Sequence, residues 1–149
     1  MLQAMPKTAR KGGESILQAS DIDLTGQVAF VTGGGGGIGR ATALCMADMG
    51  ADVAIIEAIP ERCDQVKEMV EARGRKALCI PGNVLDVEAL QNAVAVAADT
   101  FGRLDILVNN AGGVTRRNFL DLKEKNWRRH IDINLVSNIV ATQAAVPVM

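Results

Sequence analysis

The chain has 149 residues, a net charge of −1 and an apolar content of 48%. This length and composition are sufficient for one globular domain with a substantial core. The balanced charge, with no basic stripe, argues against a nucleic-acid partner. No apolar stretch approaches the roughly 20 residues needed for a membrane-spanning helix, so we expect no membrane partner.

The three cysteines, Cys45, Cys63 and Cys79, are odd in number and show no C-x-x-C spacing. Their positions predict no metal site, and they fall in segments that we expect to be helix, helix and strand. We interpret them as buried free thiols in a reducing compartment, which predicts a cytoplasmic location.

The N-terminal segment, residues 1–22, is polar, mildly basic and without an apolar secretory core. It is predicted to be a flexible tail, with a mitochondrial presequence as the less favoured alternative. The domain is therefore expected to occupy residues 23–149.

Short apolar runs predict four strands along this domain. They lie at residues 28–31, 53–56, 77–80 and 104–108. The runs are continuous rather than alternating, which is typical of parallel strands covered on both faces. With helical segments between them, they predict an α/β fold with a doubly wound parallel sheet in the order 3-2-1-4.

Helical spacing and capping residues support the intervening helices. Ala41, Cys45 and Met49 share one face of the first predicted helix. Pro60 suits the first turn of the second helix, and Asp86 can cap the N-terminus of the third.

A last helix is predicted over residues 123–145. Its apolar side chains recur at helical spacing and form one stripe. The stripe consists of Trp127, Ile131, Leu135 and Ile139.

A T-G-G-G-G-G-I-G run follows the first predicted strand. The order strand, glycine turn, helix places backbone N–H groups at a helix N-terminus, where a phosphate is favoured. The five consecutive glycines leave two registers open. Gly34, Gly36 and Gly39 satisfy G-x-G-x-x-G, whereas Gly33, Gly37 and Gly39 satisfy T-G-x-x-x-G-x-G. Both registers predict a dinucleotide site.

Glu57 ends the second predicted strand, at the position from which a carboxylate can bind both ribose hydroxyls of an adenosine. The same carboxylate would repel a 2′-phosphate, so Glu57 predicts NAD rather than NADP. Arg62 is nearby, but it is expected to lie one turn into the following helix.

The third and fourth predicted strands also end in residues suited to a ligand. Asn83, with Val84 beside it, can offer a donor and an acceptor to an adenine edge, although a turn-forming role is the alternative. Asn-Asn-Ala-Gly at residues 109–112 has small residues that allow backbone to approach a ligand.

Together, the glycine run, Glu57 and Asn-Asn-Ala-Gly resemble the short-chain dehydrogenase/reductase family over residues 23–149. This resemblance implies the N-terminal, cofactor-binding half of a Rossmann-type domain, truncated before the later strands. It also implies hydride transfer between NAD and a small-molecule alcohol or ketone, once the chain is completed.

The resemblance assigns roles to individual residues. Asn134, in Asp-Ile-Asn-Leu, would be the catalytic asparagine that holds the water of a proton relay. The implied cofactor-binding residues are Gly33, Gly37, Ile38, Gly39, Glu57, Asn83, Val84, Asn109, Ala111 and Gly112.

Two departures from the family pattern affect the expected function. The family usually has Asp at the position of Asn83, which we interpret as a tolerated change. The chain contains no Tyr, and the family's Ser and Tyr-x-x-x-Lys motif is absent. We therefore expect weak NAD binding without turnover by these 149 residues. An unpaired fourth strand would also favour self-association, as a homo-oligomer.

Other functions remain open at this point. A non-catalytic relative that binds a nucleotide or a partner would show the same sequence features. A Rossmann methyltransferase is less favoured, because it normally has an acidic residue where this chain has Thr32. A P-loop NTPase is disfavoured by Arg40 and Ala41, which replace the required Lys and Ser/Thr.

Overall fold

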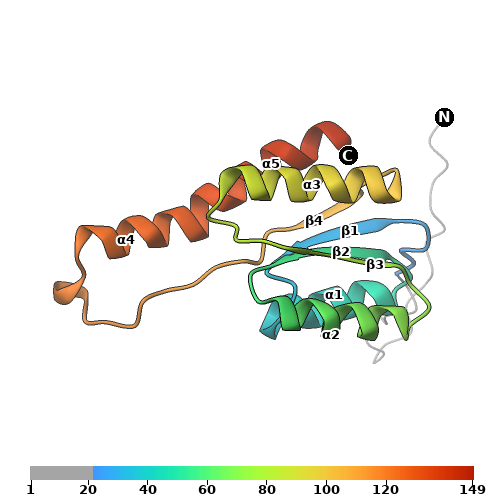
Figure 1. The fold of residues 1–149 in the computed structure, drawn as a ribbon, viewed down its shortest axis with the longest axis horizontal. Coiled ribbons are helices and arrows are strands. Elements are labelled where there is room, and N and C mark those ends of the chain that lie inside the picture. The colour runs from blue at the N-terminus through green and yellow to red at the C-terminus, as the bar shows by residue number, and fades with distance from the viewer. Residues whose placement is uncertain (1–21) are drawn as a thin grey trace, which may run out of the picture.

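A computed structural model of the protein describes residues 22–149. These residues form a parallel sheet with helices on both faces, as predicted (Figure 1). The predicted tail, residues 1–22, lies outside the described residues except for Ile22.

Strands and helices alternate through the first part of the domain. They are β1 Val28–Thr32, α1 Gly37–Asp48, β2 Asp52–Glu57, α2 Pro60–Glu71, β3 Ala77–Pro81, α3 Val87–Phe101 and β4 Ile106–Val108. The C-terminal part contains η2 Phe119–Asp121, α4 Glu124–Ile131, η3 Asp132–Val136, α5 Ser137–Ala145 and η4 Val146–Val148. The strands are parallel, and their order β3-β2-β1-β4 confirms the predicted topology.

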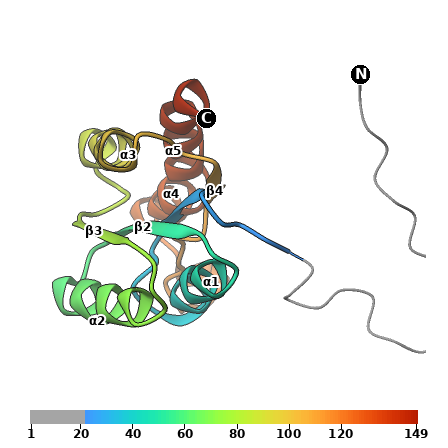
Figure 2. The same ribbon diagram turned by 90° about the vertical axis from the view of Figure 1, so that its right-hand side faces the viewer.

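Helices cover both faces of the sheet, which explains the continuous apolar runs. Figure 2 shows α1 and α2 on one face and α3 and α5 on the other. Phe30 and Ile56 pack into the core on the α3 and α5 side, whereas Val31 and Ile55 pack on the opposite side. Every residue of β1 is buried, as expected of a central parallel strand.

The fourth strand is shorter than predicted and pairs with β1 over Ile106–Val108. Before it, the carboxylate of Asp105 accepts a hydrogen bond from the N–H of Val28 at 2.8 Å. It also accepts hydrogen bonds from the Arg103 guanidinium, which hold the pKa of Asp105 below its usual value. An ionised carboxylate thus joins the start of β4 to the start of β1.

The first helix buries a different face from the one marked by Ala41, Cys45 and Met49. Its buried residues are Gly39, Ala43 and Ala47. Small side chains let α1 lie close to β1 and β2, whereas Ala41 and Cys45 are exposed.

The interpretation of all three cysteines as buried free thiols is wrong. Cys63 on α2 and Cys79 on β3 form a disulfide, with their Cα atoms 5.4 Å apart. Cys45 is free but exposed. The packing of α2 on β3 brings together two residues whose sequence spacing matches no motif. The free-thiol argument for a cytoplasmic location is therefore lost, and that location stays a prediction.

The predicted C-terminal helix is divided by the π-helical turn η3 into α4 and α5. Its predicted apolar stripe remains exposed: Trp127, Ile131, Leu135 and Ile139 are 41–55% accessible. Other residues of α5 pack against α3 instead. They are Val140, Ala141 and Ala145.

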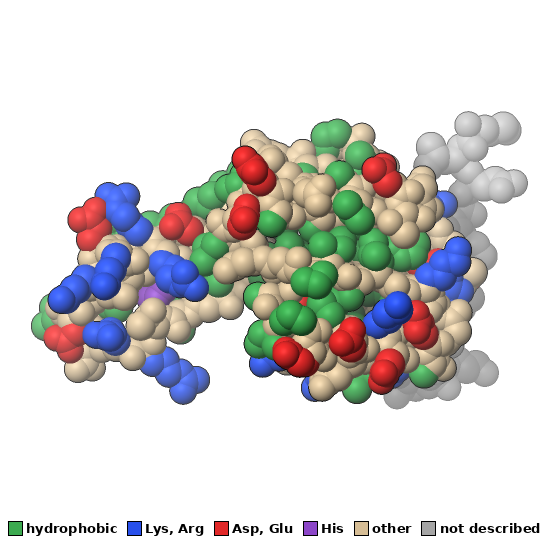
Figure 3. Space-filling view, viewed as in Figure 1, with side chains coloured by type: hydrophobic (Ala, Val, Ile, Leu, Met, Phe, Trp, Pro, Cys, Tyr) green, Lys and Arg blue, Asp and Glu red, His purple; other side chains and the backbone are tan. Residues whose placement is uncertain are grey.

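The continuous helical segment Glu124–Val148 has 25 residues and contains an 18-residue window with a mean hydropathy of 1.2, which is enough to span a membrane by length and composition. The expectation that no stretch reaches this length was therefore wrong. Of that window, 22% is buried in the structure, and its α5 part packs on α3. Figure 1 shows α4 projecting away from the sheet, and Figure 3 shows that Lys and Arg side chains gather on this projection.

Candidate nucleotide-binding site

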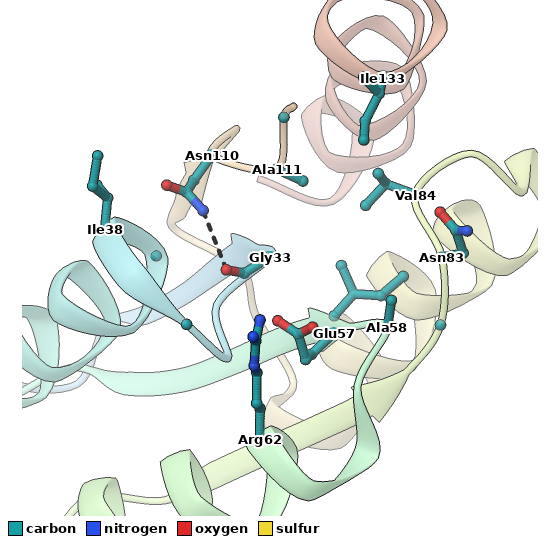
Figure 4. A pocket seen from close by; sticks show the side chains of 15 residues that line it. Gly33, Ile38, Glu57, Ala58, Arg62, Asn83, Val84, Asn110, Ala111 and Ile133 are labelled. Carbon is teal, nitrogen blue, oxygen red and sulfur yellow. Dashed lines mark hydrogen bonds between the residues drawn. The ribbon is translucent and has the colours of Figure 1, made fainter. Parts of the chain in front are cut away.

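A cavity of about 370 Å³ lies between the glycine turn and the carboxyl ends of β2, β3 and β4. Its volume is within the range of small-molecule sites. Figure 4 shows the side chains that surround it. The lining residues are Gly33, Gly36, Ile38, Gly39, Ile56, Glu57, Ala58, Arg62, Gly82, Asn83, Val84, Asn110, Ala111, Gly112 and Ile133.

The backbone of the glycine turn distinguishes the two possible registers. Gly33 and Gly37 have positive φ angles of 63° and 52°, which favour glycine. Gly39 is buried, and a Cβ atom there would overlap the carbonyl oxygen of Gly33. The T-G-x-x-x-G-x-G register therefore contains the three glycines that the backbone itself requires.

The glycines between these positions make room for side chains from other elements. A Cβ atom at Gly34 would lie 2.5 Å from Cγ2 of Ile55, and one at Gly35 would lie 2.5 Å from Cγ of Glu57. These separations are far below ordinary van der Waals contact, so β2 can pack beneath the turn only if both positions lack side chains.

The N-terminus of α1 presents unpaired backbone donors to the cavity. Its N-cap residue, Gly36, provides no side-chain hydrogen bond. Arg40 N–H is the first to bond within the helix, to the Gly36 carbonyl. The preceding N–H groups, including those of Ile38 and Gly39, have no helical acceptor. Both residues line the cavity, so this end of α1 can receive a phosphate.

Glu57 lies at the end of β2 and is 7% exposed. One carboxylate oxygen accepts a hydrogen bond from Gly35 N–H and the other from Ile59 N–H, each at 3.0 Å. These bonds hold the carboxylate beside the glycine turn. Each oxygen keeps further acceptor capacity, so Glu57 can still bind a hydroxyl in the cavity.

Thr32 and Asn110 connect the glycine turn to the end of β4, and neither was predicted as a site residue. The hydroxyl of Thr32 accepts hydrogen bonds from the N–H groups of Asn110 and Ala111, each at 3.0 Å. The Asn110 amide donates to the carbonyls of Thr32 at 2.9 Å and Gly33 at 3.2 Å. Both residues belong to the recognised sequence motifs, but only the fold shows that they bind each other.

Among the predicted site residues, Asn83, Val84, Ala111 and Gly112 line the cavity. The side-chain oxygen of Asn83 accepts a hydrogen bond from Leu85 N–H at 3.0 Å, which matches the turn-forming alternative for this residue. Its amide nitrogen remains available to a ligand.

Two other predicted residues lie outside the lining. The exposed Gly37 contributes the positive φ that starts α1. The side chain of Asn109 donates to the Thr142 hydroxyl at 3.1 Å, and so connects the end of β4 to α5.

Asn134 lies in η3, outside the residues that line the cavity. Its side chain accepts from Gly113 N–H at 3.1 Å and donates to the carbonyls of Gly113 at 2.9 Å and His130 at 2.8 Å. A Cβ atom at Gly112 would lie 2.7 Å from the side-chain oxygen of Asn134. Asn134 therefore fastens the segment after β4 to the helix, and its role in a proton relay stays a prediction.

These features fit an extended nucleotide cofactor. The glycine turn, which has no side chains, and the free N–H groups of α1 can bind a pyrophosphate, and the Glu57 carboxylate can bind a ribose. The cavity lies at the carboxyl edge of the sheet. There the central strand β1 has β2 on one side and β4 on the other, so the strand order changes direction at β1. This is the position at which doubly wound sheets bind dinucleotides.

Comparison with known proteins gives the same assignment. The family model for short chain dehydrogenases matches residues 27–149. Oxidoreductase UcpA of Salmonella typhimurium is 38% identical over 126 residues, which are 85% of this chain and 48% of that protein. This chain thus spans about half the length of the curated relatives it matches.

Solved structures share the fold. A carveol dehydrogenase from Mycobacterium avium in complex with NAD has a TM-score of 0.80 at 33% identity, covering 84% of this chain and 50% of its own. A short chain dehydrogenase from Burkholderia cenocepacia in complex with NADP has a TM-score of 0.82 at 42% identity, covering 85% and 52%. The topology, the glycine turn and the matched family model together show that this chain belongs to the short chain dehydrogenase family.

Proposed function

We propose that this chain provides the cofactor-binding half of an NAD-dependent oxidoreductase that acts on an alcohol or ketone. The observation that carries the proposal is a single cavity lined by both the N-terminus of α1 and the Glu57 carboxylate. Glu57 is held there by its hydrogen bond from Gly35 N–H in the glycine turn. Catalysis is proposed for the whole protein, because its relatives are about twice as long as the matched region.

The bound nicotinamide cofactor would accept or donate the hydride. Residues of this chain would hold it in position. The free N–H groups at the start of α1 would bind the pyrophosphate, Glu57 the adenosine ribose, and Asn83 with Val84 the adenine edge. Asn110 and Thr32 would keep the glycine turn in the shape that accepts the phosphates.

The proposed preference for NAD over NADP rests on the charge and position of Glu57. A carboxylate can accept hydrogen bonds from a ribose diol, but it repels the negative charge of a 2′-phosphate. Structures similar to this chain include complexes with NAD and with NADP, so the choice depends on residues particular to each protein.

We expect Glu57→Gln to weaken NAD binding by about 1.5–3 kcal/mol, the scale of charge-assisted hydrogen bonds. NADP binding should fall much less, because the substitution also removes the repulsion of the 2′-phosphate. Isothermal titration of both cofactors measures this difference. Glu68→Gln, at an exposed position on α2, controls for the change in net charge.

A loss of affinity for NAD and NADP by the same factor would contradict the ribose role. It would mean that Glu57 acts by holding Gly35 and the turn. Unchanged affinity for both cofactors would show that Glu57 neither binds the ribose nor supports the glycine turn.

We also propose that the chain self-associates. In the described residues, β4 has a neighbour on one side, β1, and its other edge is unpaired. Beside it is an apolar groove of about 590 Å³ that includes Ile38, Cys45, Met49 and Ile106. An open strand edge next to apolar side chains favours pairing with a second copy.

We expect sedimentation velocity to show dimers or larger species of the purified protein. Ile106→Lys should shift them towards monomer, because it places a charge at the strand edge. Val114→Lys changes an apolar residue that is 73% exposed away from this edge and provides the control. A monodisperse monomer for the unchanged protein would refute self-association.

A further inference from the structure

A second cavity of about 420 Å³ lies between the turn that precedes α3 and one face of the helical segment α4–α5. We call it the α3–α4 pocket. It shares Val84 with the nucleotide cavity, and its other lining residues have no role in the proposed cofactor site. Its volume is within the range of small-molecule sites, so it can hold a ligand of its own.

One face of the helical segment forms a wall of the α3–α4 pocket and changes in character along its length. The lining residues on this face follow one another at intervals of three or four, which places them on the same side of a helix. They are Lys125, Arg129, Asp132, Val136 and Val140. The wall is therefore charged along α4 and becomes apolar towards α5.

The opposite wall of the pocket is apolar. It consists of Val84 and Leu85, in the turn before α3, and Val87, the first residue of that helix. Figure 1 shows the start of α3 beside the junction of α4 and α5, and α3 packs against α5. Val84 is 8% exposed and Val140 is 9% exposed. An apolar group bound at this end of the pocket would therefore be removed from water.

The cations of the pocket exceed its carboxylates. Three cations line it, whereas Asp132 is the one acidic residue among the described lining residues. Arg128 is paired with the Glu124 carboxylate at 2.6 Å. The ion pairs within residues 22–149 include neither Lys125 nor Arg129, so both are available to an anion. Figure 3 shows Lys and Arg side chains gathered on this part of the surface.

We propose that the α3–α4 pocket binds an amphiphilic carboxylate, a small molecule with one anionic head on an apolar chain. Lys125 and Arg129 would donate charge-assisted hydrogen bonds to the head. The chain would pack against the valines of α5 and of the turn before α3, where its burial favours binding. This site goes beyond the proposed function, because it requires no nucleotide.

The lining of the pocket disfavours other classes of ligand. A cation would be repelled by the excess positive charge. An inorganic anion such as phosphate would gain nothing from the apolar walls, and a neutral apolar molecule would leave the two free cations unused. The Ser137 hydroxyl already donates to the Ile133 carbonyl at 2.8 Å, so it offers no free proton to a neutral polar ligand.

The experiment is isothermal titration of octanoate, below its micelle-forming concentration, into the purified protein. We expect saturable binding. The uncharged analogue 1-octanol should bind at least tenfold more weakly, because it lacks the charge that Lys125 and Arg129 recognise. Hexanoate should bind more weakly by about fourfold for each methylene group removed from a fully buried chain. Added salt should weaken octanoate binding, because both cations are exposed.

Arg129→Gln locates the binding site. It should lower the affinity for octanoate roughly tenfold, the effect of losing a charge-assisted contact, and leave the affinity for 1-octanol unchanged. Arg129→Lys should recover part of the loss. Arg116→Gln is the matched control, because it removes an equal charge from an exposed residue outside the pocket lining. It should leave both affinities unchanged.

Four results would overturn the proposal. Absence of octanoate binding would refute it outright, and equal affinities for octanoate and 1-octanol would refute recognition of the carboxylate. An unchanged octanoate affinity in Arg129→Gln would mean that the ligand binds elsewhere, as in the apolar groove beside β4. Displacement of octanoate by excess 5′-AMP would mean that it occupies the nucleotide cavity, whereas a separate site predicts that both bind together.

Discussion

Replacing Gly39 by alanine is expected to weaken NAD binding by roughly tenfold or more, about 1.4 kcal/mol, and to destabilise the fold. The added Cβ would overlap the Gly33 carbonyl oxygen and the amide nitrogen of Asn110. Those atoms are hydrogen-bonded to each other. Relief of the overlap must therefore move the glycine turn away from α1.

Two opposing effects determine the change in stability. Alanine favours a helix over glycine by up to about 1 kcal/mol. Overpacking of a buried site costs about 1–3 kcal/mol, and the upper part of that range applies because main-chain atoms cannot rotate away as a side-chain end can. We expect a net destabilisation of about 1–2 kcal/mol, measured by urea unfolding.

Gly113→Ala is a matched control for this experiment. Gly113 has no positive φ, and the nearest atom to an added Cβ is Cδ1 of Ile133 at 3.9 Å. It should leave both stability and NAD affinity nearly unchanged. If Gly39→Ala behaves like this control, the close approach of α1 to the turn is not required for the site.

The strand pattern could be predicted from the sequence because a strand that is buried on both faces needs apolar residues at consecutive positions. Each central strand appears as a short, continuous apolar run, and the crossover rule then limits the topology. The extent of β4 could not be predicted in the same way. Leu104 is buried but precedes the paired residues Ile106–Val108, and Asp105 between them bonds to Val28 through both its carboxylate and its backbone N–H.

The register of the glycine run depends on contacts that a sequence does not contain. The five glycines satisfy two motifs equally well. The choice follows from the φ angles of Gly33 and Gly37 and from the approach of Gly39 to the Gly33 carbonyl. Gly35 is needed for a different reason, since the side chain of Glu57 occupies the space beside it.

Residues from separate elements were the main omission from the predicted site. Arg62 could not be placed from its position in α2, because its long side chain returns over the first turn toward the cavity. The Cys63–Cys79 disulfide was missed for a related reason: their proximity comes from the packing of α2 on β3. A helix-spaced stripe can likewise remain exposed, as Trp127 and Leu135 do.

The second large effect is expected from Thr32→Val, which keeps the shape of the side chain and removes its hydroxyl. Thr32 is 2% exposed, and its oxygen is the acceptor for the N–H groups of Asn110 and Ala111. The two N–H groups are partly buried, and each such donor left without a partner costs up to about 1–3 kcal/mol. We expect a total loss of about 2–5 kcal/mol, a large part of the stability of a typical domain.

The same substitution should also weaken nucleotide binding. Asn110 and Ala111 line the cavity, and the Asn110 amide holds the carbonyls of Thr32 and Gly33. If the Asn110 backbone loses its anchor, that amide becomes less well positioned and the glycine turn becomes freer to move. Hydrogen exchange should then be faster at the N–H groups of Asn110 and Ala111 than in the unchanged protein.

Thr32→Ser separates the hydroxyl from the methyl group. Serine keeps the acceptor for both N–H groups and loses one buried methyl, which costs about 1 kcal/mol. Urea unfolding should therefore place the serine variant close to the unchanged protein and the valine variant far below it. Equal destabilisation of the two variants would show that packing of the methyl group, rather than the hydroxyl, joins β1 to the end of β4. The serine variant should also retain the NAD affinity, because the geometry of Asn110 and the glycine turn depends on the oxygen atom.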